Sequence, residues 1–325
     1  MGQGILVVIE QSNGNVRRVA YEMLSLAQQL APEAVTALTF GPGAEATQEH
    51  LGRYGADQLT AFSQETFSRY SSDGFAQAVV NVVEQIDPGA VFFPATAWGK
   101  DLAPRVAGLL KAGLATDCVD VVANDRGTLD GIRPVYAGKA IAHVAIDTPR
   151  QLFSIRPNVQ KPVESHRPAT IVALEPGLAA SEFLAVVTEV KVNSGTTLEL
   201  TEADTIVSGG RGIKAPENYH LLDELAAALG AATGSSRPLA DEGWVPHSYH
   251  IGQTGKVVSP TVYFAIGISG AIQHLAGISS SKYIVAINND KDAPIFKAAN
   301  YGIIGDLFQV VPALTKEVLA LKSSQ

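Results

Sequence analysis

Cysteine is almost absent from the sequence, since Cys118 is the only one among 325 residues. The chain therefore cannot form an internal disulfide, which is typical of proteins from a reducing compartment. The patterns C-x-x-C and H-x-x-x-H do not occur, and the seven histidines are scattered. Because neither a metal-ligand spacing nor a nucleophile–base pair is evident, we expect no metal site and no substrate conversion by the chain itself.

Positive charge is also in short supply. The 24 lysines and arginines are outnumbered by 32 acidic residues, which gives a net charge of −8. Nucleic-acid binding needs a basic surface, so we expect no nucleic-acid partner. One uncharged run, residues 261–278, is long enough to suggest a membrane span, but it contains glycines together with Ser269, Gln273 and His274. A buried strand, loop and helix explains this run better than membrane insertion.

The common nucleotide-binding motifs are missing too. The stretch "GQTGK" at residues 252–256 resembles a P-loop, but its glycines are too close together and Lys256 is followed by Val257. Residues 267–277, "GISGAIQHLAG", begin with G-x-x-G, so the dinucleotide fingerprint G-x-G-x-x-G is absent. These absences disfavour a nicotinamide-dependent oxidoreductase and a general nucleotide-binding module.

What the sequence does contain is an alternation of strand-like and helix-like segments. Residues 5–10, "ILVVIE", are apolar and β-branched, and residues 16–31 repeat apolar side chains at helical spacing. Alternation of this kind predicts βαβ units around a mostly parallel sheet. Later strand candidates follow one another without helices between them, so we expect that portion to be antiparallel: residues 119–123, 151–155, 170–175 and 183–192.

A polar segment without helical periodicity, residues 192–203, predicts a linker that could act as a hinge. We therefore expect one α/β domain over residues 1–191 and a second over residues 204–325. In the second domain the alternation restarts, with a helix predicted at residues 219–230 and strands at residues 205–207, 262–267, 283–288 and 307–311.

Polar residues gather in the loops of the second domain, several of which follow its strands, where open α/β sheets bind ligands. They comprise neutral hydrogen-bonding residues and a few cationic ones: Ser236, Gln253, Thr254, Ser269, Gln273 and Asn288, with Arg211, Arg237 and His274. Such a set suits a planar heterocycle that is edged by carbonyls and nitrogens and gains negative charge on reduction. Each residue alone also has a structural interpretation, because a threonine in a glycine-rich loop is commonly a turn residue and an arginine can simply pair with an acid.

Taken in order, these segments resemble the α subunit of electron-transfer flavoproteins. The similarity is strongest in "TIVSGGRGIKAPENYHLL" (residues 205–222), in "GQTGK" and "GISGAIQHLAG", and in residues 284–312. It is looser but continuous over the first domain. The resemblance implies that the second domain is a doubly wound, mostly parallel sheet that binds one FAD noncovalently. It also implies that the first domain packs on a partner β subunit.

The resemblance implies particular roles at the flavin. Thr254 is expected to form a hydrogen bond with flavin N5, Arg237 to lie against the isoalloxazine, and His274 to reach the C2 carbonyl. Arg237 and His274 would then favour the anionic one-electron-reduced ring over the neutral one. A helix opened by Gly270 would direct its N–H groups at the pyrophosphate. The sequence departs from the family pattern at His250, where a glutamine or similar residue is usual, and at Trp98 in the first domain.

The remaining implied contacts are with the ribityl chain, the pyrophosphate and the adenosine. The full set of cofactor residues implied by the resemblance is Arg211, Ser236, Arg237, Ile251, Gly252, Gln253, Thr254, Ser269, Gly270, Ala271, Ile272, Gln273, His274, Asn288, Asp306 and Leu307. Of these, Asn288 and Asp306 are expected at the adenosine end.

The function implied is that of a redox carrier rather than an enzyme. The chain would accept electrons from flavin dehydrogenases of the acyl-CoA dehydrogenase type and pass them to a membrane quinone oxidoreductase. The alternative is a subunit of an electron-bifurcating complex that oxidises NADH and carries a second FAD in the β subunit, where a plain carrier has AMP. The opening stretch "MGQGILVVIEQ" lacks the layout of a signal or transit peptide. We therefore expect a bacterial cytoplasmic location, or the mitochondrial matrix if the chain is a mature form.

Overall fold

The computed structural model describes residues 4–31, 34–136, 138–165, 168–178, 182–190 and 199–323. The chain falls into two compact units, the first comprising residues 1–135 and 141–193 and the second residues 136–140 and 194–325. Of the predicted linker, residues 192–198 lie outside the described residues.

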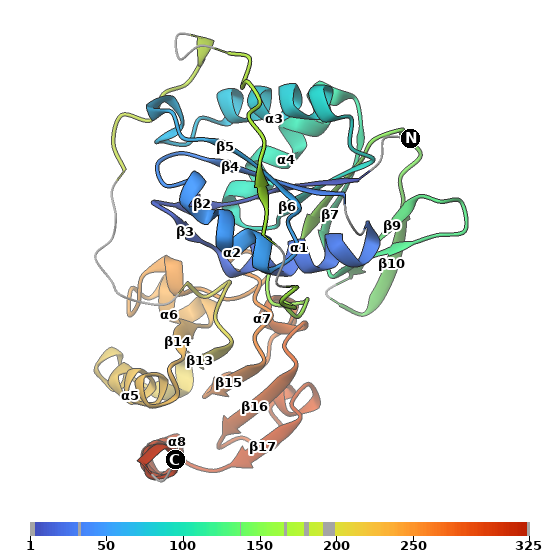
Figure 1. The fold of residues 1–325 in the computed structure, drawn as a ribbon. Coiled ribbons are helices and arrows are strands. Elements are labelled where there is room, and N and C mark those ends of the chain that lie inside the picture. Colours follow the sequence, from blue (N-terminus) through green and yellow to red (C-terminus); the bar gives the residue numbers. More distant parts are fainter. Residues whose placement is uncertain are drawn as a thin grey trace. The chain divides into compact units, whose positions relative to one another are not determined.

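A seven-stranded parallel sheet forms the centre of the first unit (Figure 1). The strands, in spatial order, are β12 (Thr170–Ile171), β5 (Gln58–Phe62), β4 (Val35–Phe40), β1 (Ile5–Val8), β6 (Ala90–Pro94), β11 (Gln151–Ile155) and β7 (Gly113–Cys118). Successive side chains of a strand point to opposite faces. Val7 therefore packs with helix α1 (Arg18–Leu30), and Leu6 packs with helices α3 (Ser72–Ile86) and α4 (Ala97–Leu110). The minor elements are β2 (Gln11–Ser12), β3 (Asn15–Val16) and α2 (Gln48–Arg53).

The antiparallel arrangement predicted for the later strands is wrong for the large sheet. Strands β11 and β12 run parallel to their neighbours, and β11 lies between β6 and β7 with all five residues buried. The chain passes from β7 to β11 through a small sheet instead of a helix: β8 (Asp120–Ala123), β9 (Leu129–Val135) and β10 (Ala140–Ala145). Parallel neighbours are usually connected through a helix. This connection has no helical pattern in its sequence, so the parallel pairing of β11 was not predicted. The strand predicted at residues 183–192 does not occur in its described part, residues 183–190.

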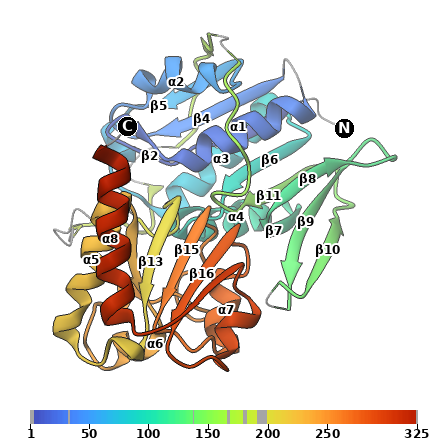
Figure 2. The same ribbon diagram turned by 90° about the horizontal axis from the view of Figure 1, so that it is seen from below.

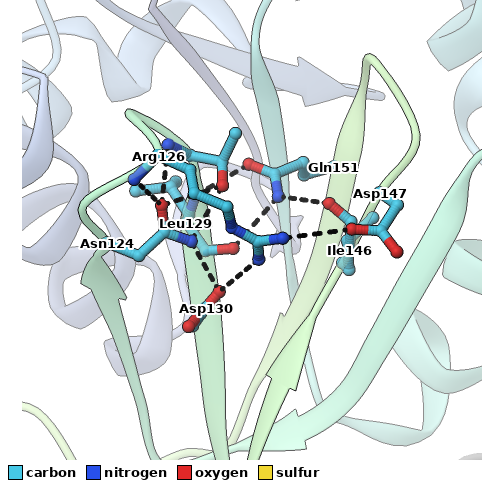
Figure 3. A network of polar contacts seen from close by, with 8 residues as sticks. Asn124, Arg126, Leu129, Asp130, Ile146, Asp147 and Gln151 are labelled. Carbon is cyan, nitrogen blue, oxygen red and sulfur yellow. Dashed lines mark hydrogen bonds and ion pairs between the residues drawn. The ribbon is translucent and has the colours of Figure 1, made fainter.

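The side chain of Gln151, the first residue of β11, joins the small sheet to the large one (Figure 3). Its Oε1 accepts a hydrogen bond from the Leu129 N–H at 2.9 Å, and its Nε2 donates to the carbonyls of Leu129 and Ile146 at 3.0 Å each. Gln151 is only 3% exposed, so these bonds satisfy an amide that would be costly to bury unpaired. Figure 3 also shows Arg126, which pairs with Asp130 and Asp147.

The second unit contains a five-stranded sheet in which every neighbouring pair is parallel. Its strands, in spatial order, are β14 (Ala232–Ser235), β13 (Thr205–Gly209), β15 (Val262–Ile266), β16 (Tyr283–Asn288) and β17 (Tyr301–Ile304). The helices of this unit are α5 (His220–Leu229), α6 (Arg237–Asp241), α7 (Ile272–Ile278) and α8 (Leu307–Ser323) (Figure 2). The prediction of two α/β units, the second doubly wound around a parallel sheet, is confirmed.

Alternate residues of the central strands face different helices. Val207 and Ile266 belong to the core that contains residues of α5 and α8, whereas Ile206 and Tyr263 belong to the core that contains Ile278 of α7. Helices therefore cover both faces of the sheet, as a buried parallel sheet requires.

The strand predicted at residues 307–311 is wrong, because this segment is the start of α8. Leu307 and Val311 are spaced four residues apart and both are buried against the core that contains α5, which is a helical period rather than a strand period. Strand β17, just before it, was not predicted; all four of its residues are exposed.

None of the helices in the described part of the chain combines the length and the apolar character needed to cross a membrane.

Candidate functional site

A cavity of about 640 Å³ lies at the carboxyl ends of the strands in the second unit. The chain leaves β13 for β14 on one side and later reaches β15 on the other side of β13. The loops that follow β13 and β15 consequently diverge, and such a switch point is where open α/β sheets bind ligands. The volume is within the usual range for sites that bind small molecules and cofactors.

Most of the predicted cofactor residues line this one cavity. They come from the segments that follow β13, β14 and β15, from the end of β16 and from the loop at residues 250–258: Arg211, Ser236, Arg237, Ile251, Gln253, Thr254, Ser269, Ala271, Gln273, His274 and Asn288. Asn288 also shapes the site, because its Nδ2 donates to the Ile268 carbonyl at 2.9 Å and its Oδ1 accepts from the Asp290 N–H at 3.0 Å. It thereby holds the loops after β15 and β16 together.

Five predicted residues do not line the cavity: Gly252, Gly270, Ile272, Asp306 and Leu307. Asp306 caps helix α8, since its Oδ1 accepts a hydrogen bond from the Phe308 N–H at 3.1 Å. Leu307 is buried in the core beneath that helix. Helix α7 begins at Ile272, not at Gly270, whose φ of 86° is in the left-handed region.

Several residues that line the cavity were not among the predicted cofactor residues: Gly212, Pro238, Asp241, His250, Gly267, Ile268, Asp290, Ala293 and Pro294. Asp241 and Asp290 were not predicted because the expected set comprised neutral hydrogen-bonding residues and cations. Asp241 lies one helical turn after Arg237, and that spacing is the signal that could have identified it.

The loop that carries Thr254 is attached to helix α7. The Gln253 N–H donates to the Gln273 carbonyl at 2.8 Å, and the Val258 N–H donates to the Gly277 carbonyl at 2.9 Å. Gly277 and Gly252 are packed so closely that a Cβ atom on Gly277 would lie 2.6 Å from the Gly252 backbone. The loop is therefore held on the helix by its backbone, and Thr254 stands exposed at the cavity wall.

The lysine of "GQTGK" does not act as a P-loop lysine would. Lys256 is not part of the cavity wall, and its Nζ pairs with Glu199 Oε1 at 2.6 Å. A P-loop lysine instead reaches the phosphates of its ligand. The glycines of this loop allow close packing, and they do not form a phosphate cradle.

Both arginines of the cavity are exposed and paired with acids. Arg237 Nε lies 3.0 Å from Asp241 Oδ2, and Arg211 Nε lies 4.0 Å from Glu242 Oε1. The arginine side chains are 64% and 70% exposed. Exposed pairs of this kind contribute little to stability, so either guanidinium can turn towards an anionic ligand at small cost.

His274 differs from its expected role as a cation. It is 6% exposed, and its Nε2 lies 3.0 Å from the Tyr263 hydroxyl. Burial lowers its pKa to about 4, so the imidazole is neutral at pH 7 in this pocket. Its Nδ1 is buried without a hydrogen-bond partner among the described residues. Burial and the nearby Arg237 also lower the pKa of His250.

These groups suit a flavin dinucleotide. The unpaired Nδ1 of His274 calls for a polar ligand atom, since buried polar groups are normally hydrogen-bonded. Thr254, Ser236 and the two arginines line the same cavity and carry hydrogen-bond donors of the kind that carbonyls and phosphates accept.

Comparison with known proteins agrees with this interpretation. Residues 5–179 match the family model of the electron transfer flavoprotein domain, and residues 199–279 match that of the electron transfer flavoprotein FAD-binding domain. The electron transfer flavoprotein subunit alpha of Syntrophomonas wolfei subsp. wolfei is 42% identical over 97% of this chain and 99% of its own length. That of Bacillus subtilis is 41% identical over 98% of each chain.

Protein FixB of Clostridium saccharobutylicum is 35% identical over 99% of this chain and 98% of its own length. All three matches run through both units, so the likeness is not confined to the cofactor loops. The chain is thus an alpha subunit of the electron transfer flavoprotein family.

Proposed function

We propose that the chain holds one FAD noncovalently in the cavity of its second unit and carries electrons through it as one half of a heterodimer with a β subunit. One observation carries the proposal: exposed Thr254, two exposed arginines and His274, whose buried Nδ1 has no partner among the described residues, line a single switch-point cavity. The flavin supplies the redox chemistry when it is bound. The chain's own residues bind it, orient it and set the charge around it.

Three residues have distinct tasks in this proposal. The Thr254 hydroxyl forms a hydrogen bond with flavin N5 from a loop whose backbone is held on α7. Arg237 places positive charge beside the ring system, where reduction adds negative charge. His274 offers Nδ1 to the C2 carbonyl as a neutral donor, so the favourable charge at the ring comes from Arg237 and not from the imidazole.

The proposed partners lie outside this chain. Electrons would come from flavin dehydrogenases of the acyl-CoA dehydrogenase type and leave to a membrane-bound quinone oxidoreductase. The first unit would pack on the β subunit. We place the heterodimer in the bacterial cytoplasm.

The proposal is tested on the purified heterodimer by its absorbance spectrum and its cofactor content. One FAD and one AMP per heterodimer are expected. Two FAD molecules would instead favour the bifurcating, NADH-oxidising alternative. A colourless heterodimer that takes up no FAD would refute a flavin function of either kind.

Replacing Thr254 by valine is expected to weaken FAD binding modestly. The variant keeps the shape of the side chain and removes one hydroxyl, whose net hydrogen bond is worth about 1 kcal/mol, or about fivefold in the dissociation constant. Equilibrium dialysis with FAD measures this change, and the flavin absorbance band should shift as the N5 contact is lost. Thr261→Val is the control, because Thr261 is exposed and does not line the cavity. If Thr254→Val and the control bind FAD with equal affinity, Thr254 does not form the proposed hydrogen bond with flavin N5.

A further inference from the structure

A buried tyrosine contacts the histidine at the wall of the flavin cavity. Tyr263 belongs to β15, is 0% exposed, and packs in the core that also contains Ile278 of α7. His274 lies in the first turn of α7 and lines the cavity. The Tyr263 hydroxyl lies 3.0 Å from His274 Nε2, so one ring nitrogen faces the core and the other, Nδ1, is left without a partner in the described structure.

Both groups are neutral at physiological pH. Burial raises the pKa of Tyr263 and lowers that of His274. A neutral imidazole carries its proton on only one nitrogen, and the hydrogen bond at the other nitrogen decides which one. A hydroxyl that donates to Nε2 therefore leaves the proton on Nδ1.

The pairing of buried polar atoms favours donation by the tyrosine. The contact with His274 Nε2 is the one hydrogen bond of the Tyr263 hydroxyl among the described residues. If Nε2 donated to the hydroxyl, the phenol proton and Nδ1 would both be buried without a partner in that part of the chain. If the hydroxyl donates to Nε2, only Nδ1 is left without a partner, so this arrangement is the less costly one.

We propose that Tyr263 is a positioning residue: its hydroxyl donates to His274 Nε2, keeps the imidazole proton on Nδ1, and so presents a neutral N–H donor to a carbonyl of the bound ligand. The identity of that carbonyl as part of a flavin rests on the proposed function. The tautomer does not, because it follows from contacts within the chain. Without the tyrosine hydroxyl the imidazole proton is free to move to Nε2. Nδ1 would then be a hydrogen-bond acceptor, and it could not bind the ligand carbonyl, which is also an acceptor.

The tautomer can be read directly by nitrogen NMR of the full chain in its heterodimer, labelled with ¹⁵N-histidine. The His274 signals are assigned by their loss in His274→Gln. At neutral pH we expect a protonated Nδ1 and a bare Nε2, both with and without FAD. A proton on Nε2 in the flavin-free protein would overturn the proposal. If the heterodimer takes up no FAD and the proton is nevertheless on Nδ1, the proposed function fails while the role of Tyr263 stands.

The variant Tyr263→Phe removes the hydroxyl and keeps the ring. We expect the imidazole proton to move to Nε2 and the dissociation constant for FAD to rise about tenfold, because a lost donor leaves a carbonyl unsatisfied. Tyr219→Phe is the matched control: Tyr219 is 7% exposed, and its hydroxyl donates to the Gly234 carbonyl at 2.9 Å, away from the cavity wall.

The control should leave both the tautomer and the affinity for FAD as in the wild type. An unchanged tautomer in Tyr263→Phe would overturn the positioning role. A moved proton with unchanged affinity would overturn the use of Nδ1 as a ligand donor. If Tyr263→Phe does not fold, the nitrogen NMR spectrum of the wild type still tests the proposal, because it shows which ring nitrogen of His274 carries the proton.

Discussion

Gly277→Ala is expected to abolish most FAD binding while the second unit stays folded. The added Cβ atom would lie 2.6 Å from the N and Cα atoms of Gly252, and neither backbone atom can rotate out of the way as a flexible side chain could. The loop must therefore move away from α7. That movement breaks the hydrogen bonds that Gly277 and Gln273 accept from Val258 and Gln253.

The expected size of the effect follows from the cost of overpacking. An extra methyl group at a close contact costs roughly 1–3 kcal/mol. Because the displaced loop carries Thr254, we expect the dissociation constant for FAD to rise up to about a hundredfold. Fluorescence titration of the flavin-free protein with FAD measures it, and circular dichroism checks that the sheet is intact.

Gly108→Ala is the matched control for this substitution. Gly108 also lies inside a helix, α4 of the first unit, but apart from the helix's own neighbouring backbone no atom lies within 4 Å of its added Cβ. The control should bind FAD normally and unfold at a slightly higher temperature, because alanine is favoured over glycine in a helix by about 0.5–1 kcal/mol. If Gly277→Ala binds FAD as tightly as this control does, the glycine contact is not what holds the Thr254 loop.

Arg237→Ala is expected to lower the reduction potential for the first electron by about 60 mV, equivalent to a tenfold change in the equilibrium. Arg237 is a cation at the cavity wall, and an added negative charge a few ångströms away is stabilised by roughly 1–2 kcal/mol once solvent screening is included. Dithionite titration with a reference dye measures the potential.

Asp241→Asn tests the same electrostatic argument with the opposite sign. Asp241 lies 3.0 Å from Arg237 and also lines the cavity, so its carboxylate opposes the positive charge. Removing that negative charge should raise the potential. If both substitutions shift the potential in the same direction, a change in cavity shape and not charge is responsible.

The site illustrates which part of a binding pocket can be inferred from sequence. Thr254, Ser269 and Asn288 were identifiable because they follow glycines or buried strands, and the ends of parallel strands meet at one edge of a sheet. Asp306 was expected at the adenosine end by resemblance alone, and its role as the cap of α8 became visible only in the structure.

Other features depended on contacts between residues distant in sequence. The partner of His274 is Tyr263, eleven residues earlier, and nothing in the spacing indicates that the hydroxyl would meet Nε2. The neutral state of the imidazole follows from its burial, which no local pattern reveals. The sequence alone therefore led to a cationic histidine where the structure has a neutral one.

In the first unit, too, some elements could be predicted from local sequence patterns and others depended on distant contacts. Strand β1 and helix α1 were evident from the apolar and helical patterns of residues 5–10 and 16–31. In contrast, β11 looked antiparallel because the helix that usually connects parallel strands is replaced by β8, β9 and β10. Residues 307–311 were misassigned because a short apolar run fits both a buried strand and the buried face of a helix.

The sequence by itself determined the α/β class, the family and the loops from which a cofactor would be held, since these depend on hydrophobic periodicity and on the order of residues along the chain. Only the tertiary structure decided the strand pairing of β11, the attachment of the Thr254 loop to α7, and the charge and partner of His274. Those properties arise from distance and burial, which appear only when separate segments pack together.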